Sequence, residues 1–194
     1  MKRCTHRLIV LFLALLFLTA CAALEAADPF VVDPTHSSVV FKIQHAGISS
    51  IFGRFNEMSG DFMIDKQDPA NSTFALNIKA NSVDTNNAAR DKHLRSPDFF
   101  NTKQFPALTF KSTSVRRVEK GYEVTGDFTM HGVTKQITFV LEGGSKEIEF
   151  PKGRKRIGFT TALTLKRSDF GMEKPAGVLG DDVHVEIGIE AVQK

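Results

Sequence analysis

The sequence predicts an all-β fold: an eight-stranded antiparallel barrel with a short helical lid at about residues 86–103. After residue 28, most of the chain alternates apolar and polar residues with the period of a half-buried strand. The expected strands follow one another through short turns, which favours antiparallel neighbours. A single sheet of that size, apolar on one face, curls on itself, and closure removes its unpaired edges.

The first 27 residues predict a secretory signal. A positive start that contains Lys2, Arg3 and Arg7 precedes an unbroken apolar run at 8–18, and small residues follow that run. The run is too short for a structural membrane-spanning helix. We therefore expect an exported domain that occupies residues 28–194.

Both cysteines, Cys4 and Cys21, fall in this front segment, so the domain itself contains no pair that could form a disulfide. Residues 18–21 (LTAC) resemble a lipobox, in which cleavage before Cys21 would leave a lipidated N-terminus and a membrane attachment. Ordinary cleavage near residues 24–27 would discard the cysteine instead. Both alternatives stay open, and both place the domain outside the cytoplasm.

The charge of the expected domain is close to zero. Removal of residues 1–27 leaves 22 Lys and Arg against 21 Asp and Glu. A nucleic-acid partner would require a basic surface, and this balance gives it no electrostatic support. The sequence also predicts no cofactor and no metal site.

The strands can be placed in order along the chain. After an edge-type segment at 28–34, we expect strands at 38–45, 54–65, 73–83, 108–114, 122–130, 133–142, 157–165 and 183–191. Residues 46–53 are apolar without a strand period and are expected to cross an end of the sheet. Residues 143–156 are expected to form a basic loop, and 166–182 a second long excursion.

The lid breaks the strand period for about twenty residues. Asn86 or Asn87 can cap a short helix with the sequence AARDKHLR, and Ser96-Pro97-Asp98 has the residues of a second helix start. Within the first helix, an exposed Asp91–Arg95 pair is expected. Helices this short are marginal alone and must pack onto the barrel. The segment is either a gate or a plug that closes one end.

The inward faces of the predicted strands are rich in Phe and aliphatic residues. If the interior is hollow, its ligand is apolar; otherwise the same side chains pack a dry core. The expected lining residues are Phe41, Ile43, Phe62, Phe74, Leu76, Phe110, Phe128, Phe139, Phe159, Leu163, Val185 and Ile187.

Three stretches resemble the YceI family of bacterial periplasmic and secreted proteins. They are HSSVVFKIQHAGISSIFGRF, SVDTNNAARDKHLRSPDFFNTKQFPALTFKSTSV and GDFTMHGVTK, and the resemblance extends over residues 30–192. It implies a lipocalin-like barrel, a periplasmic location and binding of a long polyisoprenoid or other amphiphilic lipid. It also permits a homodimer.

A lipid carrier is therefore the favoured function, with an isoprenoid or quinone-like tail inside the barrel. Each isoprene unit carries about five carbons, and burial contributes ~0.8 kcal/mol per CH₂, so a few units suffice for micromolar binding. At the barrel mouth, His93, Phe99 and Phe100 of the lid are expected to meet the ligand.

Two other classes of function compete with the carrier. An enzyme could use His45 or His93, although no HxH, HExxH or nucleophile-elbow spacing occurs in the sequence. A periplasmic partner of a membrane redox protein is the third class. There the basic run Lys152–Arg156 (KGRKR) could touch a partner or an anionic lipid surface.

Overall fold

The structure is a computed structural model that describes residues 27–174 and 177–194. The expected signal segment and Cys21 lie outside the described residues. The strands are β1 (Asp28–Val32), β2 (Ser38–His45), β3 (Ser49–Phe55), β4 (Met58–Ile64), β5 (Thr73–Lys79), β6 (Val83–Asp84), β7 (Ala107–Val118), β8 (Gly121–Met130), β9 (Val133–Glu149), β10 (Lys155–Lys166) and β11 (Leu179–Gln193). The helices are α1 (Ala88–Leu94) and the 3₁₀ turns η1 (Pro69–Asn71), η2 (Ala80–Ser82) and η3 (Ser168–Phe170).

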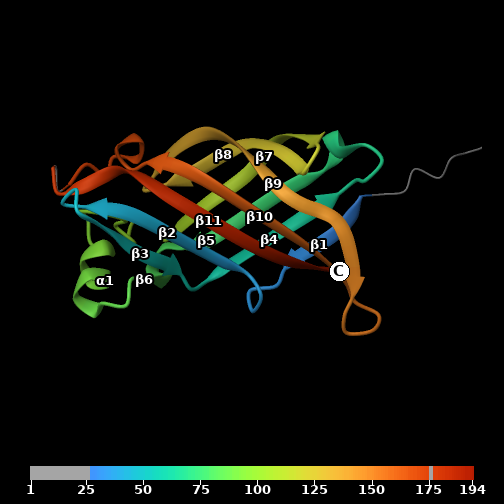
Figure 1. Ribbon diagram of the computed structural model, residues 1–194, viewed down its shortest axis with the longest axis horizontal. Helices are drawn as coiled ribbons and strands as arrows, with labels where there is room; N and C mark the ends of the chain where they lie inside the picture. Colours follow the sequence, from blue (N-terminus) through green and yellow to red (C-terminus); the bar gives the residue numbers. More distant parts are fainter. Residues whose placement is uncertain (1–26, 175–176) are drawn as a thin grey trace, which may run out of the picture.

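Eight strands close into an antiparallel barrel, as the sequence predicted. Their order is β1-β4-β5-β7-β8-β9-β10-β11, and pairing of β1 with β11 closes the ring. Figure 1 shows the barrel lengthwise, with α1 beside one end and the C-terminus toward the other. Within the described chain, no helix is long and apolar enough to cross a membrane.

The long strand β11 explains how eleven strands make an eight-stranded ring. Its last residues, 191–193, pair with β1, whereas residues 179–188 pair with β2. At the α1 end, β2 and β3 therefore take the places that β1 and β4 hold at the other end. The two-residue strand β6 extends β3 by pairing with Arg54 and Phe55.

The structure corrects two predicted connections. Residues 46–53 do not cross the sheet end: they form the turn and second strand of the β2–β3 hairpin, in which Ala46 and Gly47 adopt positive φ. The predicted strand 54–65 is accordingly divided between β3 and β4. Residues 143–156 are mostly strand, because β9 runs to Glu149 before the hairpin into β10.

The lid contains one α-helix and a series of turns. Asn87 caps α1, since its side chain accepts a hydrogen bond from the Arg90 N–H. The second helix predicted at Ser96 does not form. The Phe100 N–H bonds back to the Leu94 carbonyl at 3.0 Å, so the chain folds onto the end of α1.

Aromatic residues fill the barrel end opposite the lid. Phe62, Phe74, Tyr122 and Phe159 are each at most 2% exposed. The Phe62 and Phe74 ring centroids lie 5.0 Å apart, and Phe74 and Phe159 lie 5.8 Å apart. Among the described residues, all strand pairings lie between Asp28 and Gln193, so the ring closes within residues 28–194.

Candidate functional site

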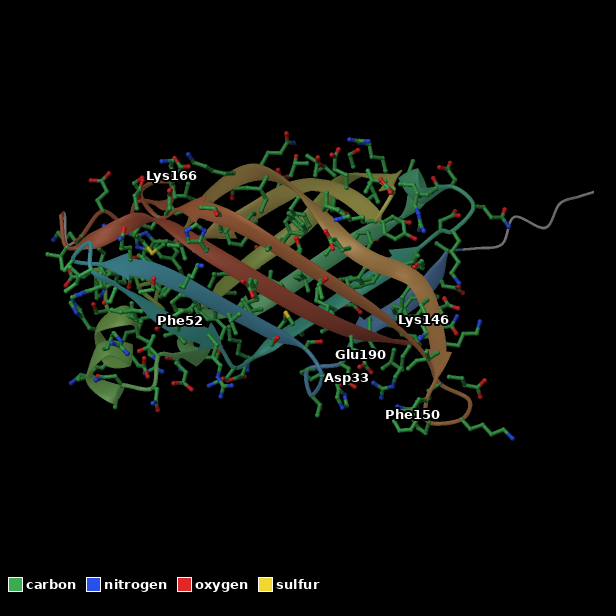
Figure 2. All side chains as sticks on the ribbon, viewed as in Figure 1. Asp33, Phe52, Lys146, Phe150, Lys166 and Glu190 are labelled. Carbon is green, nitrogen blue, oxygen red and sulfur yellow. The ribbon has the colours of Figure 1, made fainter. Side chains whose placement is uncertain are left out.

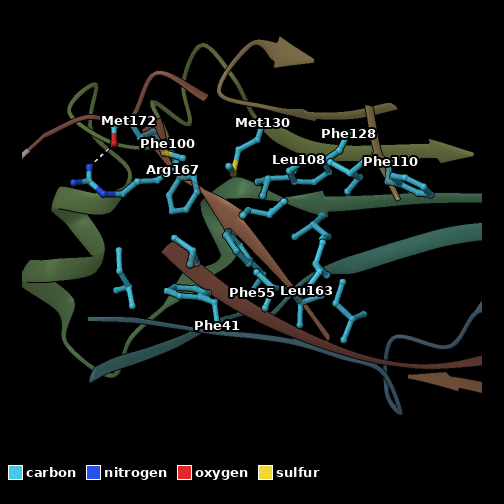
Figure 3. Close-up of a pocket in the computed structure, with 18 of the residues that line it drawn as sticks. Phe41, Phe55, Phe100, Leu108, Phe110, Phe128, Met130, Leu163, Arg167 and Met172 are labelled. Atoms are coloured by element: carbon cyan, nitrogen blue, oxygen red, sulfur yellow. Dashed lines mark hydrogen bonds between the residues drawn. The ribbon is translucent and has the colours of Figure 1, made fainter. Parts of the chain in front are cut away.

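An apolar cavity occupies the barrel interior on the lid side. Its volume is about 140 Å³. Its lining is aliphatic, aromatic and methionine side chains, with Thr109 and Arg167 as the polar members. Figure 3 shows Phe41, Phe55 and Leu163 on one side of it and Leu108, Phe110 and Phe128 on the other.

Nine of the twelve residues expected to line the interior do line this cavity: Phe41, Ile43, Leu76, Phe110, Phe128, Phe139, Leu163, Val185 and Ile187. They come from seven strands around the barrel. The ring of Phe41 covers Gly53 of the neighbouring strand, where a Cβ atom would collide with it. Contact of these residues with a ligand stays a prediction.

The other three, Phe62, Phe74 and Phe159, lie outside the cavity lining and belong to the aromatic cluster at the opposite end. They face inward, as the alternation predicted. Their rings pack against one another and fill that end of the interior. Alternation therefore identifies the face of a strand but not the depth within the barrel.

The lid closes the cavity at its end. Leu94, Phe99 and Phe100 contribute to the lining, and the Phe100 ring packs edge-on against Phe55 at 5.4 Å. His93 is not part of the lining. Its Nε2 lies 3.2 Å from an Asp98 carboxylate oxygen, and its side chain is 58% exposed.

The lid is fastened by polar bonds that differ from the expected Asp91–Arg95 pair. Asp91 is 8% exposed and accepts two hydrogen bonds from Thr85. The Arg95 guanidinium donates instead to the backbone carbonyls of Asn81 and Val83, at 2.9 and 2.7 Å. The two side chains serve different anchors because α1 lies against the barrel rather than in solvent.

Arg167 is a cavity residue that the sequence reasoning missed. It is 7% exposed, and its guanidinium donates to the carbonyls of Gly180 and Lys174, each at 2.9 Å, and to that of Met172. These bonds hold the segment after β10 across the rim of the barrel. The alternating sequence pattern could have identified Arg167 as a lining residue, because it continues the inward positions of Leu163 and Leu165.

Other lining residues were within reach of the same pattern. Val39, Ile78, Leu108, Met130, Ile137, Leu165 and Val183 lie on strand faces that alternation marks as inward. Leu94 and Met172 come from non-strand segments. For those two, the sequence carries no periodic signal.

The histidines proposed for an enzyme do not meet. His45 ends β2, where it pairs with Ser49 and Leu179, and His93 lies on α1. Neither side chain lines the cavity. The structure thus brings no pair of these imidazoles to a common site.

A polar cluster lies at the barrel end opposite the lid. One ligand atom from each of Asp33, His36 and Glu190 falls within 4.8 Å of the others, a spacing that a metal ion could use. The Arg156 guanidinium already donates to both carboxylates. Hydrogen bonds from His36 and then Arg156 hold the pKa of Asp33 well below its usual range, and the same carboxylates raise the pKa of Arg156.

Of the basic run 152–156, Arg156 is thus committed to this cluster. Lys152, Arg154 and Lys155 are exposed around the tip of the β9–β10 hairpin. Contact of this run with a partner stays a prediction.

A closed antiparallel barrel around an apolar cavity, capped by a short lid, defines a class of small ligand-enclosing β-barrels. The particular family follows from comparison with known proteins. The family model of the YceI-like domain matches residues 30–191 of this sequence, and the chain belongs to this family. Protein YceI of Escherichia coli O157:H7 is 39% identical over 189 residues, which cover 96% of this chain and 97% of that protein.

Solved structures show the same fold. The YceI protein of Campylobacter jejuni is 32% identical and superposes with a TM-score of 0.69, covering 79% of this chain and 91% of that one. A polyisoprenoid binding domain from Saccharophagus degradans gives a TM-score of 0.62 at 20% identity, over 88% of this chain and 100% of that domain.

Proposed function

We propose that this protein is exported and holds a long amphiphilic lipid in its barrel, for carriage, storage or a stress response. A polyisoprenoid or quinone-like lipid is the preferred ligand. The observation that carries the proposal is the cavity lining, in which aliphatic and aromatic side chains from strands and lid surround one space. Such a lining suits an isoprenoid tail by apolar burial alone, so the function is binding and requires no catalytic group.

The volume of the cavity is small compared with a long lipid tail. A dry apolar cavity of about 150 Å³ accommodates a molecule the size of benzene. At about 140 Å³, the cavity has room for a short part of a tail. We therefore expect Phe99 and Phe100 to move away from the barrel end when a longer tail enters.

The fold relationship supports the same ligand class. The Saccharophagus degradans domain, described as polyisoprenoid binding, has the same barrel. The cavity of the present chain is apolar enough for such a ligand, and we extend the ligand class to it on that ground.

We further propose that residues 1–27 direct export to the periplasm of a bacterium. The first described strand starts at Asp28, so removal of this segment leaves every described strand in place. The mass of the N-terminal peptide from protein made in bacteria tests the alternatives. A lipidated Cys21 means membrane attachment, and a start near residue 28 means a free periplasmic protein.

Native mass spectrometry of residues 28–194, purified from the periplasm and followed by organic extraction, tests the ligand. We expect an adduct of several hundred daltons that extracts as a prenyl or quinone species. A bare mass, with no uptake of added polyprenyl lipid, would overturn the proposal.

A cavity-filling variant makes this test specific for the site. Val185→Phe adds a ring to the cavity lining and should abolish the adduct while the barrel stays folded. Val140→Phe is the matched control, because Val140 lies on the outer surface of β9 and is 37% exposed. Loss of the adduct in both variants would place the ligand elsewhere.

A further inference from the structure

The rim of the barrel beside the lid carries exposed apolar side chains. Ile48 in the β2–β3 turn is 86% exposed, and Phe52 on β3 is 67% exposed. Val178 and Val40 are 42% and 38% exposed. We call these four residues the rim patch. Figure 2 shows Phe52 near the α1 end of the barrel, far from Phe150 at the tip of the β9–β10 hairpin.

The rim patch borders the cavity. The Ala46 N–H donates to the Val178 carbonyl at 2.6 Å, which joins the β2–β3 turn to the segment before β11. The next residue, Leu179, pairs with His45 and lines the cavity. The exposed apolar residues therefore lie on the outside of the same rim whose inside receives the ligand.

The hairpin that carries three of the four rim-patch residues is basic, although Glu186 of β11 lies opposite Val40 and Asp84 lies 3.8 Å from Arg54. The hairpin at 38–55 contains Lys42 and Arg54 and no Asp or Glu. Lys42 lies opposite Phe52 in the β2–β3 register. Across the parts of the chain that the structure describes, Lys42 has no ion-pair partner, and the same holds for Lys92 and Lys103 in the lid.

Several carboxylates near the rim have basic side chains beside them. Asp98 lies beside His93 and Lys174, Asp169 pairs with Lys135, and Asp181 lies 4.0 Å from Lys166. These bases thus offset part of the negative charge at the rim, whereas Lys42 forms no ion pair with any described carboxylate.

We propose that the rim patch docks on a bilayer that contains anionic lipid, so that a tail passes directly between the bilayer and the cavity. Exposed apolar residues flanked by lysines bind the boundary between headgroups and acyl chains through apolar burial and attraction to anionic lipid. The proposal rests on the proposed function, because an apolar tail would otherwise have to cross water to reach the cavity. It also explains why large apolar side chains stay exposed at this rim.

The rim patch and the start of the described chain lie at opposite ends of β11. The rim residue Leu179 starts β11, and the other end of that strand, at 191–193, pairs with β1, where the described chain begins. Fifteen strand residues at about 3.3 Å each separate these ends by roughly 50 Å. Docking therefore has to be measured with residues 28–194, which lack the cysteine.

The test is flotation of residues 28–194 with vesicles of phosphatidylcholine and phosphatidylglycerol. The rim variant is Ile48→Ser with Phe52→Ser. The control variant is Ile148→Ser with Phe150→Ser, which changes the same residue types at the opposite end, where the exposed fractions are 48% and 67%. We expect the rim variant to lose vesicle affinity by about tenfold or more, with the control unchanged. Omission of phosphatidylglycerol should weaken binding of the unchanged protein.

Three outcomes would overturn the proposal. They are absence of vesicle binding by the unchanged protein, loss of binding in the control variant alone, and a rim variant that changes only the oligomeric state in sedimentation. The second would place docking at the basic β9–β10 hairpin, and the third would make the rim patch a contact between two copies.

Failure of docking is distinguishable from failure of lipid binding. Uptake of a polyprenyl lipid from detergent micelles, read by native mass spectrometry, requires the cavity but no bilayer. We expect the rim variant to keep this uptake and to lose uptake from vesicles. If the unchanged protein takes up lipid neither from micelles nor from vesicles, the proposed function itself is overturned.

Discussion

The buried carboxylate of Asp91 accepts hydrogen bonds from both the backbone N–H and the hydroxyl of Thr85, at 2.8 and 2.6 Å. Arg90 holds the same threonine from the other side, through its hydroxyl and its carbonyl, each at 2.7 Å. Thr85 beside β6, together with the Arg95 bonds to Asn81 and Val83, thus fixes the seven-residue helix α1 to the barrel. A helix this short is marginal alone, so these bonds determine how firmly the lid is closed.

Asp91→Ala should loosen the lid without unfolding the barrel. Hydrogen bonds to a charged acceptor contribute about 1.5–3 kcal/mol, and we expect a local loss of that order. Hydrogen exchange of the α1 amides measures it. Asp98→Ala is the control, because this lid carboxylate is 49% exposed. Equal exchange in the two variants would show that Thr85 does not hold the helix.

Replacement of Phe99 and Phe100 with Ala should speed lipid exchange. Both rings line the cavity at its lid end, and their removal opens that end while the strand pairings stay intact. The rate of transfer of a bound polyprenyl lipid to acceptor vesicles gives the effect, and far-UV circular dichroism should keep its β signature. Phe150→Ala is the control. Unchanged transfer rates would reduce the lid to a plug.

The fold was predictable because the period-two pattern repeats over most of the chain. Val183, Val185 and Ile187 lie on the inner face of β11, as alternation required. The β2–β3 hairpin was missed because Ile48, Ile51 and Phe52 are apolar on both faces. Phe52 is exposed despite its type, so it breaks the pattern at the residues that form the rim patch.

The sequence predicted which strand faces point into the barrel, but it did not predict how far the cavity extends along the interior. Phe110 and Phe159 occupy the same kind of alternating position in the sequence. Phe110 lines the cavity, whereas Phe159 packs into the aromatic cluster. Their depth depends on the register of β7 and β10 in the closed barrel, which involves residues far apart in the chain. Met172 could not be placed at all, because it lies in a segment without strand periodicity.

The two ends of the barrel interior should respond differently to truncation. Phe159→Ala removes a ring from a filled cluster and should lower the free energy of unfolding by about 3–5 kcal/mol. Leu163→Ala should cost about 1–2 kcal/mol, because its side chain is half-buried and already borders open space. Urea unfolding of the lipid-free proteins gives both values. A larger loss at Leu163 would mean that the cavity is packed in solution.

The Asp33–Arg156 cluster should make stability sensitive to acid. Hydrogen bonds from His36 and Arg156 lower the pKa of Asp33 in the folded state. A depressed carboxyl pKa stabilises the folded state fully above the unfolded value of about 3.9, and this contribution is lost as the pH falls through the much lower folded-state value. Asp33→Asn should therefore lower the urea midpoint clearly at about pH 6 and by a smaller margin at about pH 3, where part of the contribution remains.

The control for this comparison is Asp127→Asn, which changes an exposed carboxylate on β8. Its midpoint should follow that of the unchanged protein at both pH values. A deficit of Asp33→Asn that is the same at both would show that the variant acts through packing and not through the charge.

Thr161 carries a buried hydroxyl on the cavity side of β10. It is 7% exposed, and its Oγ1 has no partner among the described residues. It lies on the inner face of β10, two residues before Leu163 and opposite Ile187, both of which line the cavity. A buried polar group without a partner costs about 1–3 kcal/mol, so Thr161→Val should stabilise the lipid-free protein by about 1 kcal/mol or more.

Thr160→Val is the matched control, because Thr160 is exposed on the outer face of the same strand and should change stability by less than about 0.5 kcal/mol. Urea unfolding before and after lipid loading separates two roles of the Thr161 hydroxyl. If the hydroxyl has no partner in either state, Thr161→Val stabilises the lipid-free and the lipid-loaded protein equally. If it bonds a polar group of the bound lipid, the gain disappears on loading, since the variant loses that bond. Destabilisation of the lipid-free Thr161→Val protein would contradict both roles.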